Sequence, residues 1–311
     1  MGYLEAGRWR PEDAVPSSDT GEFVRVTSTF RNRIEAGGAH PPESQRYHLY
    51  LSLACPWAHR TLIGRKLKGL EEHIGVSVVH PLSGKEGWTF ENSDGTALCT
   101  GDLVLGKQNL HEVYTTAASN FTGRVTVPVL WDKVAGTAVN NESSEILRML
   151  NSAFGELAAA DVELYPEPQR QAIDRVNEVV YTNINNGVYR CGFARTQEAY
   201  EHAFRALFST LDALEGRLGL KRCLVGDEPT EADWRLFVTL IRFDAVYYTH
   251  FKCNLRRIAD YPNLSRYLRD LYEVPGIAET VSLDHIKRHY FGSHRVLNPS
   301  GIVPIGPERP F

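Results

Sequence analysis

The sequence has no long hydrophobic run. None of its 311 residues lies in an unbroken apolar stretch of the roughly 18 or more residues that a membrane-spanning helix needs. The first residues, Met1-Gly2-Tyr3-Leu4-Glu5, lack the basic segment and apolar core of a secretory signal. We therefore expect neither a membrane partner nor export.

Cysteine is scarce: there are five residues, an odd number, and they are widely spaced. No two of them form a Cys-x-x-Cys pair, so the spacing indicates neither a zinc site nor a disulfide framework. We expect no metal and no permanently bound cofactor, and the reducing cytoplasm as the compartment. The five are Cys55, Cys99, Cys191, Cys223 and Cys253.

Charge of one sign is not in excess either. The net charge is −4, so we do not expect a broad face that binds nucleic acid. Hydrophobic residues make up 42% and charged residues 23% of the chain, which are ordinary proportions for a globular protein. A chain of this length can hold two packed domains.

The apolar pattern predicts an α/β domain followed by an all-helical (all-α) domain. We expect an extended N-terminal arm over 1–45, the α/β domain over 46–155, the helical domain over 165–292 and an extended tail over 293–311. The pattern predicts strands over 47–53, 74–79 and 125–132, and helices over 56–69, 109–120, 169–186, 197–219, 231–251, 263–273 and 284–290.

Cys55 stands between a strand-like run and a helix start. Residues 47–53 are rich in aromatic and branched types, and Pro56 suits the first position of a helix. A thiol at that place meets unpaired N–H groups and the positive end of the helix dipole, which favour the reactive thiolate. This strand–Cys–Pro–helix step predicts a thioredoxin-like domain with Cys55 as nucleophile; the alternative is a small buried Cys. His59 and Arg60 are expected to serve packing and solvation.

Two later features fit the same kind of site. Val127-Pro128 lies in a strand pattern, and since Pro cannot donate to a ladder we expect a cis bond that exposes the Val127 backbone, rather than a trans Pro on an edge strand. Glu142-Ser143 opens a helix in residues 140–145, where N–H groups and a hydroxyl can hold a carboxylate. That signal alone is weak, because such residues cap most helices. Thr230 with Asp233 is expected to be a purely structural cap.

Together, these three features in this order and spacing describe a glutathione site. Cys55 is the nucleophile, Val127-Pro128 provides a strip of exposed backbone that can pair with a peptide, and Glu142-Ser143 provides a place for a carboxylate. The chain resembles the glutathione transferases, and specifically the xi-class glutathionyl-hydroquinone reductases. The resemblance runs through nearly the whole chain. Its motifs include Cys55-Pro56-Trp57-Ala58-His59-Arg60, Gly87-Trp88, Gly123–Asp132, Asn141-Glu142-Ser143-Ser144, Asn185–Tyr189, Ala232–Phe237, Arg242-Phe243-Asp244, His250–Asn254 and Lys287–Tyr290.

The resemblance implies roles that the residues alone would not reveal. It implies that Cys55 is the nucleophile and that Tyr189 and Tyr290 are catalytic and line the hydroquinone pocket, together with Tyr165. It also implies a homodimer, with glutathione as co-substrate. The residues that it assigns to glutathione binding are Trp88, Arg124, Val127, Glu142 and Ser143. For two of these an ordinary alternative stays open: Trp88 as a loop anchor and Arg124 as a surface cation.

The implied reaction reduces a glutathionyl-hydroquinone through a mixed disulfide between Cys55 and glutathione, and releases glutathione disulfide. Ala58 occupies the place of a second, resolving Cys, so the second thiol must come from solution. The runner-up is a broader omega-like thiol transferase or dehydroascorbate reductase. A non-catalytic binding module on the same fold is the alternative outside the enzymes.

Overall fold

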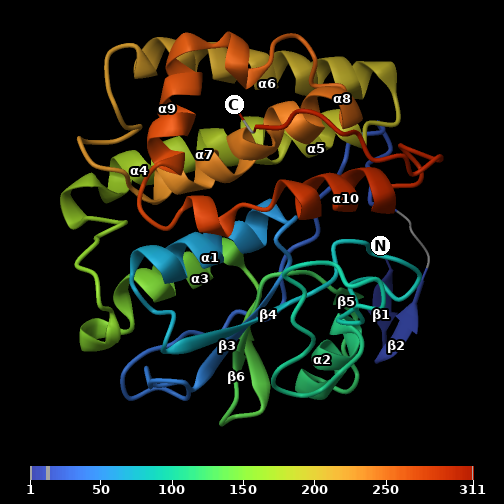
Figure 1. Cartoon of the computed structure of the whole chain (residues 1–311), viewed down its shortest axis with the longest axis vertical. Helices are drawn as coiled ribbons and strands as arrows, with labels where there is room; N and C mark the ends of the chain where they lie inside the picture. Colours follow the sequence, from blue (N-terminus) through green and yellow to red (C-terminus); the bar gives the residue numbers. More distant parts are fainter. Residues whose placement is uncertain (1, 12–14, 310) are drawn as a thin grey trace. The chain divides into compact units, whose positions relative to one another are not determined.

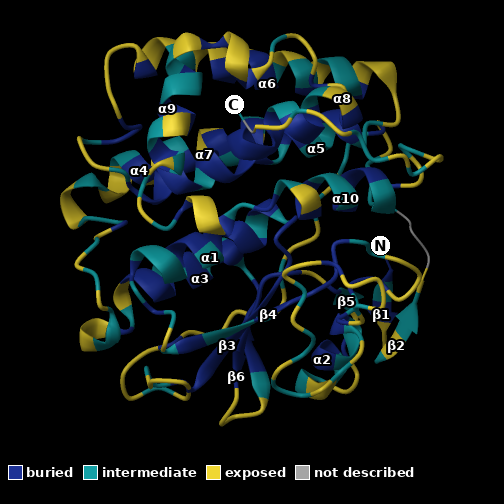
Figure 2. Ribbon diagram, in the orientation of Figure 1, coloured by how far each residue is buried: buried dark blue, intermediate teal, exposed yellow. Residues whose placement is uncertain are grey.

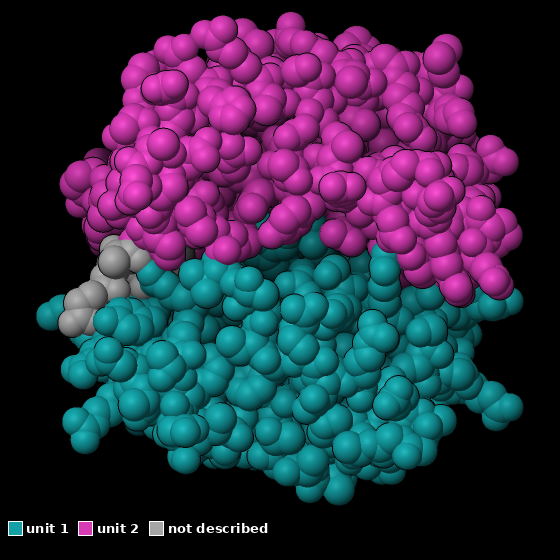
Figure 3. All heavy atoms as spheres, turned by 180° about the vertical axis from the view of Figure 1, so that it is seen from behind, with its two compact units in different colours: residues 1–14, 26–162 teal, residues 15–25, 163–311 magenta. Residues whose placement is uncertain are grey.

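The computed structural model describes residues 2–11, 15–309 and 311. Its contacts divide the chain into two compact units, which are coloured separately in Figure 3. Unit 1 comprises residues 1–14 and 26–162, and unit 2 comprises residues 15–25 and 163–311. The expected arm over 1–45 is thus shared between the two units, while the boundaries at 46–155 and 165–292 stay predictions.

A four-stranded sheet forms the centre of unit 1, in the order β4-β3-β6-β7. β3 pairs in parallel with β4 and antiparallel with β6, and every residue of β3 is buried (Figure 2). Such burial explains why this strand reads as a continuous apolar run rather than an alternating one. The strands are β3 (Tyr47–Leu51), β4 (Ile74–Val78), β6 (Val129–Asp132) and β7 (Thr137–Asn140).

Helices α1 (Pro56–Leu67) and α3 (Ser143–Ser152) lie side by side along one face of this sheet (Figure 1). They approach closely at Gly64, where an added Cβ would lie 2.6 Å from the Leu147 side chain. α2 (Leu110–Ala117) is the helix expected within 109–120. It adds buried Leu110 and Val113 to the same apolar core.

A second sheet in unit 1 was not predicted. β1 (Tyr3–Glu5) and β2 (Arg8–Arg10) form a hairpin, and β1 also pairs with β5 (Gly123–Arg124). The hairpin turns through two residues of positive φ, Ala6 (47°) and Gly7 (77°), which suits the twist of a two-residue loop.

The predicted strand over 125–132 is shorter in the structure. Pro128 has no N–H to donate, and the ladder of β6 begins only after it. β7 was missed: it has only four residues, which lie between a turn at Gly136 (φ 63°) and the start of α3.

Unit 2 is helical. The stretches expected over 169–186 and 231–251 are each interrupted by a π turn, η3 (Tyr181–Asn185) and η4 (Phe243–Tyr247). The short α5 was not predicted. The α-helices are α4 (Arg170–Val180), α5 (Gly187–Gly192), α6 (Gln197–Leu218), α7 (Glu231–Arg242), α8 (Tyr248–His250), α9 (Pro262–Tyr272) and α10 (Leu283–Ser293). Single 3₁₀ turns cover η1 (Gly155–Leu157) in unit 1 and η2 (Glu167–Gln169), η5 (Ile258–Asp260) and η6 (Ala278–Thr280) in unit 2.

The predicted cap of α7 is confirmed. Thr230 is the N-cap, and the Asp233 carboxylate accepts from the Thr230 backbone N–H at 2.8 Å. Asp233 also accepts from the Leu224 N–H and the Tyr267 hydroxyl, both at 2.8 Å. These bonds satisfy the start of a helix that is buried on nearly every side (Figure 2). Within the described residues, no helix is both long and apolar enough to span a bilayer.

Candidate functional site

Cys55 is the N-cap of α1, as the sequence predicted. Its backbone is extended (φ −77°, ψ 122°), Pro56 follows as the first helical residue, and the Cys55 carbonyl accepts from the His59 N–H at 3.0 Å. The side chain is partly exposed. The thiol therefore lies at the N-terminus of a twelve-residue helix, where the dipole favours a negative charge.

The Val127-Pro128 bond is cis, which confirms the second prediction. The Cys55 thiol donates to the Val127 carbonyl oxygen across 3.6 Å, although the two residues lie 72 positions apart in the sequence. The structure thus brings together the predicted nucleophile and the predicted backbone strip.

The third element, Glu142-Ser143, lies at the start of α3. Glu142 is the N-cap, and its carboxylate accepts from the Ser144 N–H (3.1 Å), the Ser144 hydroxyl (2.9 Å) and the Ser28 hydroxyl (3.2 Å). Ser143 is the first helical residue and is buried. The pair is therefore held rigidly at a helix N-terminus that can receive an anion.

Arg60 connects the first and third elements, and sequence reasoning missed this. It is only 1% exposed, so the expected solvation of Arg60 is wrong, and His59 is buried as well. Its guanidinium lies 4.5 Å from the centre of the Trp57 ring and donates to the Ser143 hydroxyl at 3.5 Å. The one sequence signal for this contact is the helical spacing of the Cys-Pro-Trp-Ala-His-Arg run. That spacing places Arg60 on the buried face of α1.

Trp88 and Arg124 lie in different surroundings. Trp88 is buried in the core of unit 1, and its carbonyl accepts from the first N–H of α2 at 2.9 Å. Arg124 is half-buried in β5, opposite Tyr3 of β1. The structure thus supports an anchoring role for Trp88 in the loop, and a glutathione contact of either residue stays a prediction.

Tyr189 and Tyr290 are brought together in unit 2. Their hydroxyl oxygens are 2.6 Å apart, although the residues belong to α5 and α10. A third hydroxyl, that of Tyr247 at the end of η4, lies 3.0 Å from that of Tyr290. We call these three residues the tyrosine triad. Tyr247 is one of 14 tyrosines, and no local motif distinguishes it.

The Tyr247 and Tyr290 hydroxyls are protonated at neutral pH. Burial raises the pKa of both Tyr247 and Tyr290 well above the usual value, and the nearby Tyr189 adds to this. The positive charge of buried Arg242 acts in the opposite direction, but it does not outweigh burial. Phenol groups in this state are hydrogen-bond donors.

Tyr165 is anchored separately. Its hydroxyl donates to the Asp174 carboxylate of α4 at 2.6 Å, and the Arg170 guanidinium lies 5.2 Å from the centre of its ring. These contacts tie Tyr165 to α4, so its predicted contribution to the hydroquinone pocket stays a prediction.

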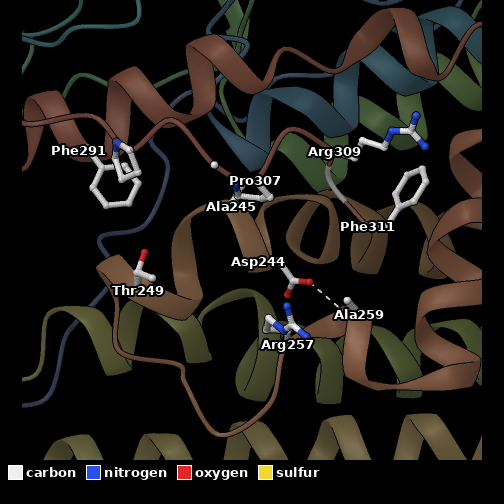
Figure 4. Close-up of a pocket in the computed structure, with 11 residues that line it drawn as sticks. Asp244, Ala245, Thr249, Arg257, Ala259, Phe291, Pro307, Arg309 and Phe311 are labelled. Atoms are coloured by element: carbon white, nitrogen blue, oxygen red, sulfur yellow. Dashed lines mark hydrogen bonds between the residues drawn. The ribbon is translucent and has the colours of Figure 1, made fainter.

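A pocket of about 590 Å³ lies elsewhere in unit 2 (Figure 4). The Asp244 carboxylate borders it and accepts from the Ile258 and Ala259 N–H groups, and burial raises the pKa of this carboxyl. Its lining also includes Thr249, Phe291 and parts of the C-terminal tail, but none of Tyr165, Tyr189 or Tyr290. The pocket is therefore no part of the predicted site. Across the described residues, no group of three or more His, Cys, Asp or Glu side chains is arranged to hold a metal ion.

Comparison with known proteins gives consistent matches. The family model of the glutathione S-transferase N-terminal domain matches residues 54–153, and that of the C-terminal domain matches residues 197–270. The chain is 54% identical to the glutathionyl-hydroquinone reductase PcpF of Sphingobium chlorophenolicum, over 100% of this chain and 98% of that protein.

Solved structures agree with these matches. The glutathione-S-transferase Xi from Phanerochaete chrysosporium matches with a TM-score of 0.93 and 53% identity, over 95% of this chain and 96% of that chain. The glutathione-bound structure of YqjG, a glutathione transferase homolog from Escherichia coli K-12, matches with a TM-score of 0.91 and 49% identity, over 99% of this chain and 96% of that chain.

Proposed function

Since the chain belongs to the glutathione transferases, and within them to the xi-class glutathionyl-hydroquinone reductases, we propose that it reduces glutathionyl-hydroquinones with glutathione. One observation carries this proposal: a cysteine without a resolving partner lies at the N-terminus of α1, with its sulfur 3.6 Å from the carbonyl of a cis-proline strip. A thiol in such a place exchanges with glutathione rather than closing an intramolecular disulfide.

Unit 1 would hold the tripeptide. The exposed backbone of Val127 pairs with the peptide groups of glutathione as an added strand would. The N–H groups and the Ser143 hydroxyl at the start of α3 receive a carboxylate, and Glu142 accepts from the ammonium group. Arg124 and Trp88 are the proposed further contacts, from β5 and from the loop before α2.

The chemistry follows in two balanced steps. The Cys55 thiolate attacks the glutathionyl sulfur, so a sulfur–sulfur bond forms while the bond between sulfur and the ring carbon breaks. The ring carbon keeps the electron pair and takes up a proton, which leaves free hydroquinone. A second glutathione then attacks the mixed disulfide, and glutathione disulfide departs as the Cys55 thiolate is restored.

Unit 2 would supply the aromatic side of the site. The Tyr189 hydroxyl, held by that of Tyr290 at 2.6 Å, donates to a ring oxygen as negative charge develops on it. Tyr165 is proposed as an additional wall, with its hydroxyl held by Asp174. We also propose that the enzyme works as a homodimer in the cytoplasm. All five of its cysteines are free thiols, which suits a reducing compartment.

Substitution of Cys55 tests the proposal. Cys55→Ala should abolish turnover of glutathionyl-hydroquinone, because no other cysteine lies at the N-terminus of α1 beside the Val127 carbonyl. Cys99→Ala is the matched control, since Cys99 is also a partly exposed thiol in unit 1 and should keep normal turnover. Incubation with glutathione disulfide, followed by peptide mass spectrometry, should place one glutathione on Cys55.

Two results would contradict the proposal. The first is near-normal turnover by Cys55→Ala; the second is a label found on another cysteine alone. A wild-type rate on dehydroascorbate or a simple disulfide that exceeds the rate on glutathionyl-hydroquinone would instead indicate a broader thiol transferase.

A further inference from the structure

The hydroxyls of the tyrosine triad form a chain with one accessible end. Tyr290 is the middle member, with its hydroxyl 2.6 Å from that of Tyr189 and 3.0 Å from that of Tyr247. Tyr247 is fully buried and Tyr290 is 1% exposed, whereas Tyr189 is half-buried. Tyr189 is therefore the member that a ligand reaches most easily.

The surroundings of Tyr247 set the direction of the hydrogen bonds. Three hydroxyl protons serve two bonds within the chain, so one proton is left for an acceptor outside it. At the buried end, the Phe243 and Phe251 rings pack on Tyr247, with ring centres 6.3 Å and 5.4 Å away. The buried Arg242 adds a positive charge that acts on the Tyr247 hydroxyl.

A cation accepts no hydrogen bond, and an aromatic ring accepts only a weak one. Tyr290 is the hydrogen-bond partner of the Tyr247 hydroxyl, at 3.0 Å. The favoured arrangement therefore turns the proton of Tyr247 toward the Tyr290 oxygen, which is a better acceptor than the surrounding aromatic rings. Tyr290 then donates to Tyr189, and the outward proton belongs to Tyr189.

The π turn η4 supports a functional reading of Tyr247. Tyr247 is its last residue, and Arg242 is the residue just before it. A π turn pairs residues five apart, and such turns are frequent at functional sites. The irregular turn thus ends at the residue whose hydroxyl contacts that of Tyr290.

We propose that Tyr247 is a positioning residue for the proposed reduction, on which this inference rests. By donating to Tyr290, it orients the Tyr290 proton toward Tyr189, so that Tyr189 is the member of the chain that donates to a ring oxygen of the departing hydroquinone. Each bond in such a chain polarises the next, so the outward donor becomes stronger.

A double-mutant cycle on turnover of glutathionyl-hydroquinone tests this role. Tyr247→Phe removes only the hydroxyl and should lower kcat roughly tenfold, the effect of losing one hydrogen bond from a buried network, while KM for glutathione stays unchanged. In the Tyr290→Phe background, Tyr247→Phe should cause no further loss, because the residue through which it acts is gone. Tyr261→Phe, at another buried hydroxyl of unit 2 that donates to Asp212, is the control and should keep normal kcat.

Three results would overturn the inference. The first is a normal kcat for Tyr247→Phe. The second is an equal loss of kcat from Tyr247→Phe in the wild-type and Tyr290→Phe backgrounds. Such a result would mark a purely structural effect, even if the variant is also less stable. The third is a wild-type enzyme that does not turn over glutathionyl-hydroquinone, which overturns the proposed function as well; the first two leave that function standing.

Discussion

At the scale of single residues, burial of histidine makes the fold sensitive to mild acid. His48 in β3 is 4% exposed, with its Nε2 2.8 Å from the Ser77 hydroxyl. Burial, followed by the charge of Lys133, lowers the pKa of His48 to about 4. Burial also lowers the pKa of His250 in unit 2 to about 4.

The sign of the effect follows from these values. Unfolded histidine has a pKa of about 6.5, so between pH 6.5 and about 4 the unfolded chain takes up protons that the folded chain does not. The free energy of unfolding should therefore fall as the pH drops through this range, by at most about 1.4 kcal/mol per pH unit for each histidine. This fall in the free energy of unfolding can be measured by urea unfolding of wild type and His48→Gln at pH 7 and pH 5.

His48→Gln should lose less stability than wild type between these two pH values, whereas His202→Gln, with 68% of the wild-type side chain exposed, should behave like wild type. An unchanged acid dependence in His48→Gln would contradict the assignment of this stability change to His48.

Asp132 does not contribute to the change in stability between pH 7 and pH 5. Burial alone would raise its pKa, but hydrogen bonds from Arg46 and His40 outweigh burial and lower it to about 2.

Residue-scale prediction from the sequence succeeded where backbone geometry determines the outcome. Cys55 before Pro56 and Val127 before Pro128 were located correctly, because proline restricts its own backbone and removes a donor. Arg60 and Tyr247 were missed. Their importance comes from partners 83 and 43 positions away, and no local pattern contains such contacts.

At the scale of elements, the start of α7 offers a test of capping inside a core. The Thr230 hydroxyl accepts from the Ala232 N–H at 3.3 Å and donates to buried Asp233 at 3.1 Å. Loss of an N-cap costs about 1 kcal/mol, and a buried carboxylate that loses a donor adds roughly 1 kcal/mol more. We expect Thr230→Ala to lower the free energy of unfolding by about 2 kcal/mol.

Thr196 provides the comparison, because it caps α6 on an exposed surface and its hydroxyl accepts from the Ala199 N–H. Thr196→Ala should cost about half as much as Thr230→Ala in the same urea titration. Equal losses in the two variants would show that burial of Asp233 adds nothing.

Long amphipathic helices were predictable, and short or irregular elements were not. The apolar period identified α6 nearly to its ends, since 22 residues give a strong signal. The π turn η4 was missed because one extra residue per turn hardly changes that period. β1, β5 and β7 have two to four residues each, and their existence depends on partners distant in the sequence.

At the scale of the whole molecule, each of the two units holds a different group of the candidate residues. Unit 1 fixes Cys55, Val127 and the start of α3 around one sheet and its covering helices. Unit 2 gathers hydroxyls from α5, η4 and α10 into one chain. The sequence predicted both kinds of architecture from the change in apolar period, and the roles of the tyrosines entered only through the family resemblance.

The activation of Cys55 is the central claim, and the pH dependence of its alkylation by iodoacetamide tests it most directly. The rate at the Cys55 peptide, followed by mass spectrometry in the Cys99→Ala variant, should be half-maximal well below the value of about 8.5 that is typical of free cysteine. A midpoint at or above that value would contradict the account, because α1 would then give the sulfur no advantage as a nucleophile.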